Sequence, residues 1–258
     1  MKVISQNRNF IYDIARISLR QMHTSIIATE IGVLRGDNAK KIIDILAPNH
    51  IFLIDAWSTD AFLEYKYNNQ HRNWVKDLDE FKDYFGGSVY CQKTLDQMHD
   101  FVVERFKNNT AVSIIRSTTR SGISEIPNLL NGELLNYIYL DANHQYETVL
   151  DDLIECEKIL HSDGLIQLND CCFSVDGIAQ NLGVLEATTN FCKRFKYTPL
   201  LVTNNDFTDI LLCKSNSRIV GVVDYIINEF NVSYVELPSS LLGALTVRHG
   251  AKHNLSFL

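Results

Sequence analysis

The stretch YIYLDANHQYE (137–147) places an acid and an imidazole directly after an apolar run. Asp141 ends the run, and His144 follows three residues later. A carboxylate can bind a hard cation, and a neutral imidazole can take a proton from a substrate hydroxyl at neutral pH. The spacing therefore indicates acid–base or metal chemistry. The structural alternative is that Asp141 caps the following segment and His144 packs in a turn.

Polar residues also stand at the ends of four other apolar runs. They are Glu30, Gly32 and Gly36 with the run 25–33, Asp55 with 50–57, Ser117 and Thr118 with 110–117, and Asn169 and Asp170 with 164–170. Ligands of open α/β sheets bind at the carboxyl ends of the strands. We therefore expect this set to line one edge of a sheet.

The stretch EIGVLRGDN (30–38) has two glycines around an expected strand-to-helix turn. Glycine lets the backbone approach a ligand closely, and a helix start offers unpaired amides. The pattern is not GxGxxG, and a turn that only changes the chain direction fits it equally well. Asp55 follows roughly 20 residues later, where an acid can bind both ribose hydroxyls of a nucleotide. As a lone acid, it would more often be a helix cap or a turn residue, but its pairing with the glycine turn favours a ribose contact.

Three side chains predict a cation site. Asp141, Asn169 and Asp170 come from adjacent strands, so their oxygens could converge on one Mg²⁺ ion. His144 would stand beside that ion as the proton acceptor.

Short apolar runs alternate with amphipathic stretches along the chain. The expected strands are 25–33, 50–57, 110–117, 136–142, 164–170, 197–205 and 208–215, and the expected helices include 35–46, 96–106 and 147–160. This alternation predicts an α/β, Rossmann-like fold, with a seven-stranded, mostly parallel sheet and helices on both faces. Only a couple of residues separate the last two runs, so we expect the final strand to be antiparallel. The expected organisation is one domain over 1–215, with a lid or insertion at about 58–90, and an extension over 216–258.

The composition narrows the functional classes. The net charge of −7 and the pI near 5.6 disfavour nucleic acid as a partner, because that affinity comes from clustered Lys and Arg. Six cysteines without a CxxC pair are typical of reduced thiols, so we expect a cytoplasmic protein. No apolar run approaches the ~20 residues of a membrane span, and the N-terminus is not typical of a signal peptide.

Four segments together resemble the class I S-adenosylmethionine-dependent methyltransferases. They are EIGVLRGDNAKKI, IFLIDAW, YIYLDANHQYETVLDDL and DGLIQLNDC, and the resemblance covers about residues 25–215. The best fit is the small O-methyltransferase branch with the macrocin and mycinamicin sugar methyltransferases, and catechol O-methyltransferase is more distant. The resemblance implies S-adenosylmethionine and Mg²⁺ as cofactors. It also implies methyl transfer to a hydroxyl of a small molecule, such as a sugar, a sugar-containing natural product or a glycan precursor.

The resemblance assigns roles to individual residues. Glu30, Gly32 and Gly36 match the motif around the methionine part of the cofactor, Asp55 matches the ribose-binding acid, and Ser117 and Asp141 complete the expected cofactor-binding set. Asp141, Asn169 and Asp170 match the metal ligands, and His144 matches the general base, with Asp141 beside it as the second catalytic residue. Two positions depart from the family. Leu34 replaces a common glycine, and Asn169 replaces an acid, which should weaken metal binding.

The acceptor is less well defined. The segment 56–90 has the composition of a lid that stacks on a ring, or of a helical insertion that packs on the core or on a second subunit. Its candidate residues are Trp57, Phe62, Tyr65, Tyr67, His71, Arg72 and Trp74. The alternatives are a metal-independent methyltransferase, an NAD- or nucleotide-binding oxidoreductase, a binding module without catalysis, and a protein or nucleic-acid methyltransferase. Whether the chain forms a homo-oligomer is left open.

Overall fold

The computed structural model describes residues 1–69, 77–171, 175–205, 207–244, 246–248 and 254–256. Its centre is a nine-stranded sheet with the order β4-β3-β2-β5-β6-β8-β7-β1-β9. The strands are β1 (Lys2–Ile4), β2 (Ile27–Ile31), β3 (His50–Asp55), β4 (Val112–Arg116), β5 (Leu135–Leu140), β6 (Leu160–Leu168), β7 (Tyr197–Thr203), β8 (Ile210–Lys214) and β9 (Tyr234–Glu236). Strand β8 runs antiparallel to both of its neighbours, and β9 runs antiparallel to β1. The other strand pairs are parallel.

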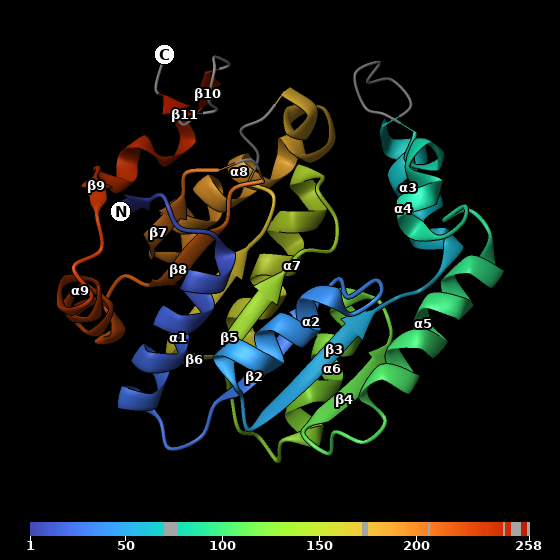
Figure 1. Ribbon diagram of the computed structural model, residues 1–258, viewed down its shortest axis with the longest axis horizontal. Helices are drawn as coiled ribbons and strands as arrows, with labels where there is room; N and C mark the ends of the chain where they lie inside the picture. The colour runs from blue at the N-terminus through green and yellow to red at the C-terminus, as the bar shows by residue number, and fades with distance from the viewer. Residues whose placement is uncertain (70–76, 172–174, 206, 245, 249–253, 257–258) are drawn as a thin grey trace.

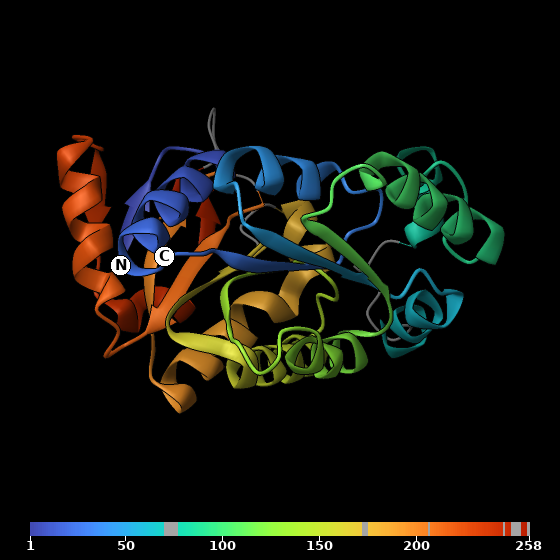
Figure 2. The same cartoon turned by 90° about the horizontal axis from the view of Figure 1, so that it is seen from below.

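Helices cover both faces of this sheet (Figures 1 and 2). One face carries α1 (Arg8–Met22), α2 (Asp37–Lys41) with its π-helical continuation (Ile42–Leu46), α5 (Gln92–Phe106) and α9 (Ile219–Glu229). The other face carries α6 (Thr119–Leu129), α7 (Tyr146–Ile159) and α8 (Val175–Phe195). Every residue of β2 and β5 is buried, because both faces of these central strands meet apolar helix surfaces.

The expected α/β architecture is therefore confirmed, with two additions at one edge. The expected strand 208–215 is β8, which lies between β6 and β7 in the sheet. It forms the expected antiparallel hairpin with β7. The sheet has nine strands rather than seven, because β1 and β9 extend it beyond β7. The segment 216–258 contributes both β9 and α9, and α9 packs against α1. The expected domain boundary at 215 stays a prediction.

The segment 58–90 forms small helices beyond the carboxyl end of β3 (Figure 1). They are α3 (Thr59–Asn69), a 3₁₀ turn (Leu78–Phe81) and α4 (Lys82–Phe85). The Phe62 and Phe85 rings lie edge to face, with centroids 6.5 Å apart. Trp57, predicted as part of a lid, is instead buried, because its indole Nε1 donates to the Leu34 carbonyl and its ring packs against the core. The side chains of Tyr65 and Tyr67 and residues His71, Arg72 and Trp74 lie outside the described residues.

Near the C-terminus, a 3₁₀ helix (Ser239–Ala244) is followed by β10 (Thr246–Arg248) and β11 (Asn254–Ser256), which pair antiparallel. Within the described residues, none of the helices combines the length and the apolar character needed to cross a membrane.

Candidate active site

The predicted site residues meet at one edge of the sheet because four backbone hydrogen bonds continue the strand ladders beyond the strand ends. The amides of Ser117, Gly32, Asp141 and Asn169 donate in turn to the carbonyls of Asp55, Ile54, Ile31 and Leu140, at 2.9–3.2 Å. Each residue that follows a strand is thereby tied to the end of a neighbouring strand. The carboxyl edge from β4 to β6 consequently forms one continuous platform.

Glycine at position 32 is required by this platform. Gly32 has a φ of +89°, and a Cβ atom there would lie 2.1 Å from the Asp141 carbonyl oxygen. An L side chain is therefore excluded by both its conformation and its contacts. This close approach brings the turn after β2 against the turn that carries Asp141.

Glu30 is a fully buried acid with one unused oxygen. Its Oε1 accepts a hydrogen bond from Asn38 Nδ2 at 2.8 Å, and the Asn38 Oδ1 accepts one from the Tyr12 hydroxyl at 2.7 Å. Its Oε2 is buried without a hydrogen-bond partner among the described residues. Burial raises the pKa of Glu30 well above its usual range. A donor, and above all a cationic one, would fit this position.

Asp55 holds the turns around it together. Its Oδ2 accepts hydrogen bonds from the amides of Val33 and Leu34, at 2.8 and 2.9 Å, and its Oδ1 accepts one from Trp57 at 2.9 Å. Leu34 and Trp57 both have positive φ values, which these bonds help to hold. The ribose-binding role of Asp55 stays a prediction, and it would require some of these amides to give way to ribose hydroxyls.

The remaining cofactor residues lie along the same edge. Gly36 caps the start of α2. Ser117 is half-buried next to Asp55 through its backbone bond.

Asp141, His144 and Asp170 form a compact cluster. Their ligand atoms lie within 4.8 Å of one another. The His144 Nε2 is 3.5 Å from Asp141 Oδ1 and 3.8 Å from Asp170 Oδ2. The three side chains are about a fifth exposed, at 23%, 23% and 17%. The cluster is therefore accessible to a small ligand but largely shielded from bulk water.

The cluster holds its charges close together in a poorly solvated place. Burial raises the pKa of Asp170 to about 6, and the negative charge of Asp141 adds to this shift. Burial would lower the pKa of His144, but the close approach of the Asp141 carboxylate at 3.5 Å and the negative charges of Asp170 and Asp141 outweigh burial and raise that pKa. Two crowded carboxylates thus favour a positive partner, either the imidazolium or a bound cation.

The cluster has the ligand chemistry for a divalent cation. Among the described residues, Asp170 Oδ1 and His144 Nε2 are buried without a hydrogen-bond partner. Buried polar atoms are normally satisfied, so an unpartnered oxygen and nitrogen at this place fit a missing ligand. Carboxylate oxygens suit both Mg²⁺ and Mn²⁺.

The Asn169 side chain points to a different partner. Its Oδ1 accepts a hydrogen bond from Arg8 Nη2 of helix α1. An amide oxygen has a second lone pair, so the metal-ligand role of Asn169 stays a prediction. The Arg8 guanidinium nevertheless places a positive charge next to Asn169 Oδ1, which is the atom that would have to bind the cation.

Sequence reasoning missed three residues that position the site. Arg8 and Tyr12 lie one turn apart on α1 and contact Asn169 and Asn38, respectively. Gly183 of α8 donates its amide to the His144 carbonyl at 3.1 Å. Asn7, the N-cap of α1, is a sequence signal for the start of that helix. No local sequence signal indicates which residues the side chains of α1 contact.

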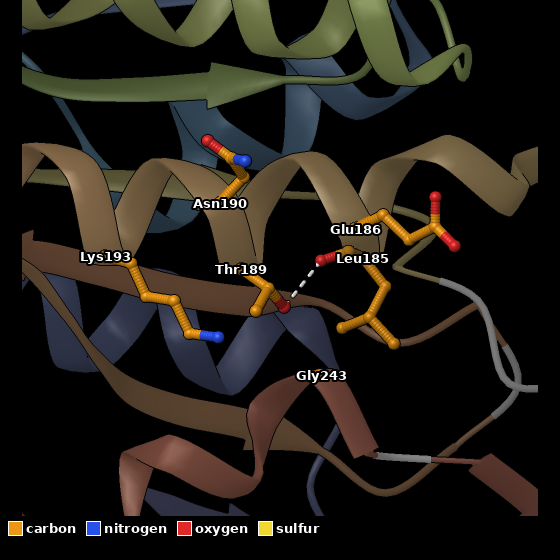
Figure 3. Close-up of a pocket in the computed structure, with 6 residues that line it drawn as sticks. All are labelled: Leu185, Glu186, Thr189, Asn190, Lys193 and Gly243. Atoms are coloured by element: carbon orange, nitrogen blue, oxygen red, sulfur yellow. Dashed lines mark hydrogen bonds between the residues drawn. The ribbon is translucent and has the colours of Figure 1, made fainter.

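A hollow elsewhere on the protein has no connection to this set. It lies between α8 and the 3₁₀ helix Ser239–Ala244, has a volume of about 240 Å³, and shares no lining residue with the candidate site (Figure 3). Its lining residues are Leu185, Glu186, Thr189, Asn190, Lys193 and Gly243.

Comparisons with known proteins agree with the fold. A family model described as a methyltransferase domain matches residues 29–171, which are 143 of the 258 residues. No curated protein matches the sequence significantly. The matched range contains the whole cluster and the glycine turn.

Solved structures with this fold are distant in sequence. An O-methyltransferase from Streptomyces achromogenes involved in tomaymycin synthesis, solved with S-adenosylmethionine, is 12% identical with a TM-score of 0.50, over 81% of this chain and 79% of that one. A Staphylococcus aureus structure with a provisional assignment as a caffeoyl-CoA O-methyltransferase is 14% identical with a TM-score of 0.50, over 82% and 86%. A spermidine synthase with a bound transition-state analogue is 8% identical with a TM-score of 0.50, over 91% and 68%. At such identities the likeness shows the fold alone.

Proposed function

Because the chain belongs to the methyltransferase domain family, we propose that it transfers the methyl group of S-adenosylmethionine to a hydroxyl of a small molecule. The observation that carries this proposal is the cluster of Asp141, His144 and Asp170 directly beside the glycine turn of β2. Transfer of a methyl group to a hydroxyl needs a cofactor site next to a proton acceptor, and the position of His144 beside the glycine turn supports this assignment.

The cofactor would lie over the glycine turn. The unused Oε2 of Glu30 suits the cationic amino group of the methionine part. The adenosine part would extend toward Asp55 and Ser117 at the ends of β3 and β4. Its ribose hydroxyls would replace some of the amides that Asp55 now binds.

A divalent cation bound by Asp141 and Asp170 would orient the acceptor oxygen and lower the pKa of its hydroxyl. The Nε2 of His144 faces both carboxylates and would accept the hydroxyl proton. S-adenosylmethionine would supply a methyl group on a sulfonium sulfur, which would keep the electron pair of the S–C bond as the new O–C bond forms, and His144 would hold the released proton. The imidazolium that results is stabilised by the two carboxylates.

For the acceptor, we favour a sugar or a sugar-containing natural product or glycan precursor. The exposed ring of Tyr84 on α4, 70% accessible, supports this choice because sugar faces pack on aromatic rings.

Ligand binding gives the first test. S-adenosylhomocysteine should raise the Tm of the protein in a thermal-shift assay, whereas NADH at the same concentration should leave it unchanged, because only a bound ligand stabilises the folded state. Stabilisation by NADH alone would favour an oxidoreductase.

Metal removal gives a second test. With an acceptor found by screening polyhydroxy compounds for S-adenosylhomocysteine release, EDTA should stop turnover and Mg²⁺ should restore it. The second candidate is a metal-independent methyltransferase, which Arg8 favours by supplying a fixed positive charge next to Asn169. Turnover that is indifferent to EDTA and Mg²⁺ would select that candidate.

A further inference from the structure

Arg8 reaches the candidate site from the N-terminal helix. It is the first residue of α1, which starts at the same end of the sheet as the carboxyl ends of β5 and β6 (Figure 1). Its side chain is 25% exposed. The Nη2 donates to Asn169 Oδ1, and the Nε lies 3.4 Å from Asp209 Oδ1. One guanidinium therefore links the turn after β6 to the start of β8.

Asp209 is held in place by its own hydrogen bonds. Its carboxylate is 1% exposed, and its Oδ2 accepts a hydrogen bond from Gln167 Nε2 at 2.5 Å. The oxygen of the Gln167 amide accepts a bond from the Tyr137 hydroxyl at 2.5 Å. The Asp209 amide donates to Thr203 Oγ1 at 2.9 Å. A buried network that is held on several strands leaves Asp209 little freedom to move.

The turn that Arg8 contacts is strained. Asp170 has a φ of +53°, a left-handed conformation that is uncommon for a residue with a side chain. Such a conformation persists only if its surroundings fix it. On one side, the Asn169 amide donates to the Leu140 carbonyl and its side chain is held by Arg8. On the other side, the Cys171 amide donates to the Thr208 carbonyl at 2.9 Å.

We propose that Arg8 is a positioning residue of the Asp141–His144–Asp170 site. By fastening the Asn169 side chain to Asp209, it fixes the turn that presents the Asp170 carboxylate to Asp141 and His144. The Asn169 side chain then anchors this turn to Arg8 rather than binding the metal ion. The inference rests on the cation site of the proposed function.

The direction of the effect separates positioning from charge. A guanidinium repels a nearby divalent cation, so a purely electrostatic role predicts that removing Arg8 tightens metal binding. A positioning role predicts the opposite, because a displaced Asp170 offers a poorer ligand set. Groups that orient metal ligands typically contribute about 10–100-fold to metal affinity.

The test is a titration of the full chain with Mn²⁺ alone, with free Mn²⁺ followed by electron paramagnetic resonance. Arg8→Met should raise the Kd for Mn²⁺ about tenfold or more. The matched control Arg20→Met removes an exposed arginine of the same helix, which donates a hydrogen bond to the Ala47 carbonyl, and should change the Kd by less than about twofold.

Arg8→Lys covers the case in which Arg8→Met does not fold. Lysine keeps a positive charge near Asp209 but lacks the planar fork that reaches two partners, so this variant should also bind Mn²⁺ more weakly than the wild type. Equal or tighter binding by the folded Arg8 variants than by Arg20→Met overturns the inference and leaves the cation site standing. A wild-type protein that binds no Mn²⁺ overturns the cation site and the inference with it.

Discussion

Gly183→Ala is expected to lower the free energy of unfolding by about 1–3 kcal/mol or more and to displace the turn that carries His144. A Cβ at this position would lie 2.0 Å from the Tyr146 amide nitrogen and 2.7 Å from the His144 carbonyl oxygen. Both contacts are with backbone, which cannot rotate away as a side chain can. Helix α8 and the turn before α7 must therefore separate, and the hydrogen bond that the Gly183 amide donates to the His144 carbonyl is lost.

Gly221→Ala in α9 is the matched control for this variant. Apart from its chain neighbours and the nearby backbone of its own helix, none of the described residues has an atom within 4 Å of the Cβ that would be added there. Alanine has a better helix propensity than glycine, so Gly221→Ala should stabilise the protein by up to ~1 kcal/mol. Urea unfolding of the two variants measures the contrast. If Gly183→Ala is as stable as Gly221→Ala, the close packing of α8 on the His144 turn is wrong.

His144→Ala is expected to reduce turnover by about 10²–10⁴-fold, because the acceptor hydroxyl loses the group that takes its proton. Binding of S-adenosylhomocysteine should be nearly unchanged, since the proposed function puts the cofactor over the glycine turn and only the acceptor next to His144. Turnover is measured as the release of S-adenosylhomocysteine with an acceptor that the wild type accepts. Calorimetry of S-adenosylhomocysteine binding gives the second readout.

His161→Ala provides the comparison for His144→Ala. His161 lies at the amino end of β6, where its ring contacts His23 with centroids 4.6 Å apart. Its removal should leave turnover close to that of the wild type. A His144→Ala variant that turns over at the wild-type rate would show that another group takes the proton.

The sequence was sufficient to predict much of the fold and the residues at the carboxyl edge. Buried parallel strands are continuous apolar runs, so the ends of β2, β3, β5 and β6 could be found from composition alone. Residues that follow adjacent parallel strands lie at the same edge of a sheet, so Asp141 and Asp170 could be expected to lie close together. Strands β1 and β9 have three residues each, which is too short for a periodic pattern to be recognised.

The contacts that orient the site could not be predicted in this way. Arg8 and Asn169 are 161 positions apart, and their contact depends on where α1 packs on the finished sheet. The roles of Asp55 and Trp57 depend on the left-handed conformations of Leu34 and Trp57, which are uncommon for residues with side chains. Gly183 is needed because the backbone at the start of α7 lies against it. A glycine inside a helix has no local sequence pattern that would predict this contact.

The most direct test of the account is a crystal structure of the protein with S-adenosylhomocysteine and Mn²⁺, with the metal located by its anomalous signal. We predict one Mn²⁺ ion bound by the carboxylates of Asp141 and Asp170, with the sulfur of the ligand over the glycine turn and an open space next to His144. An ion bound elsewhere, or a ligand that does not contact the turn after β2, would contradict it.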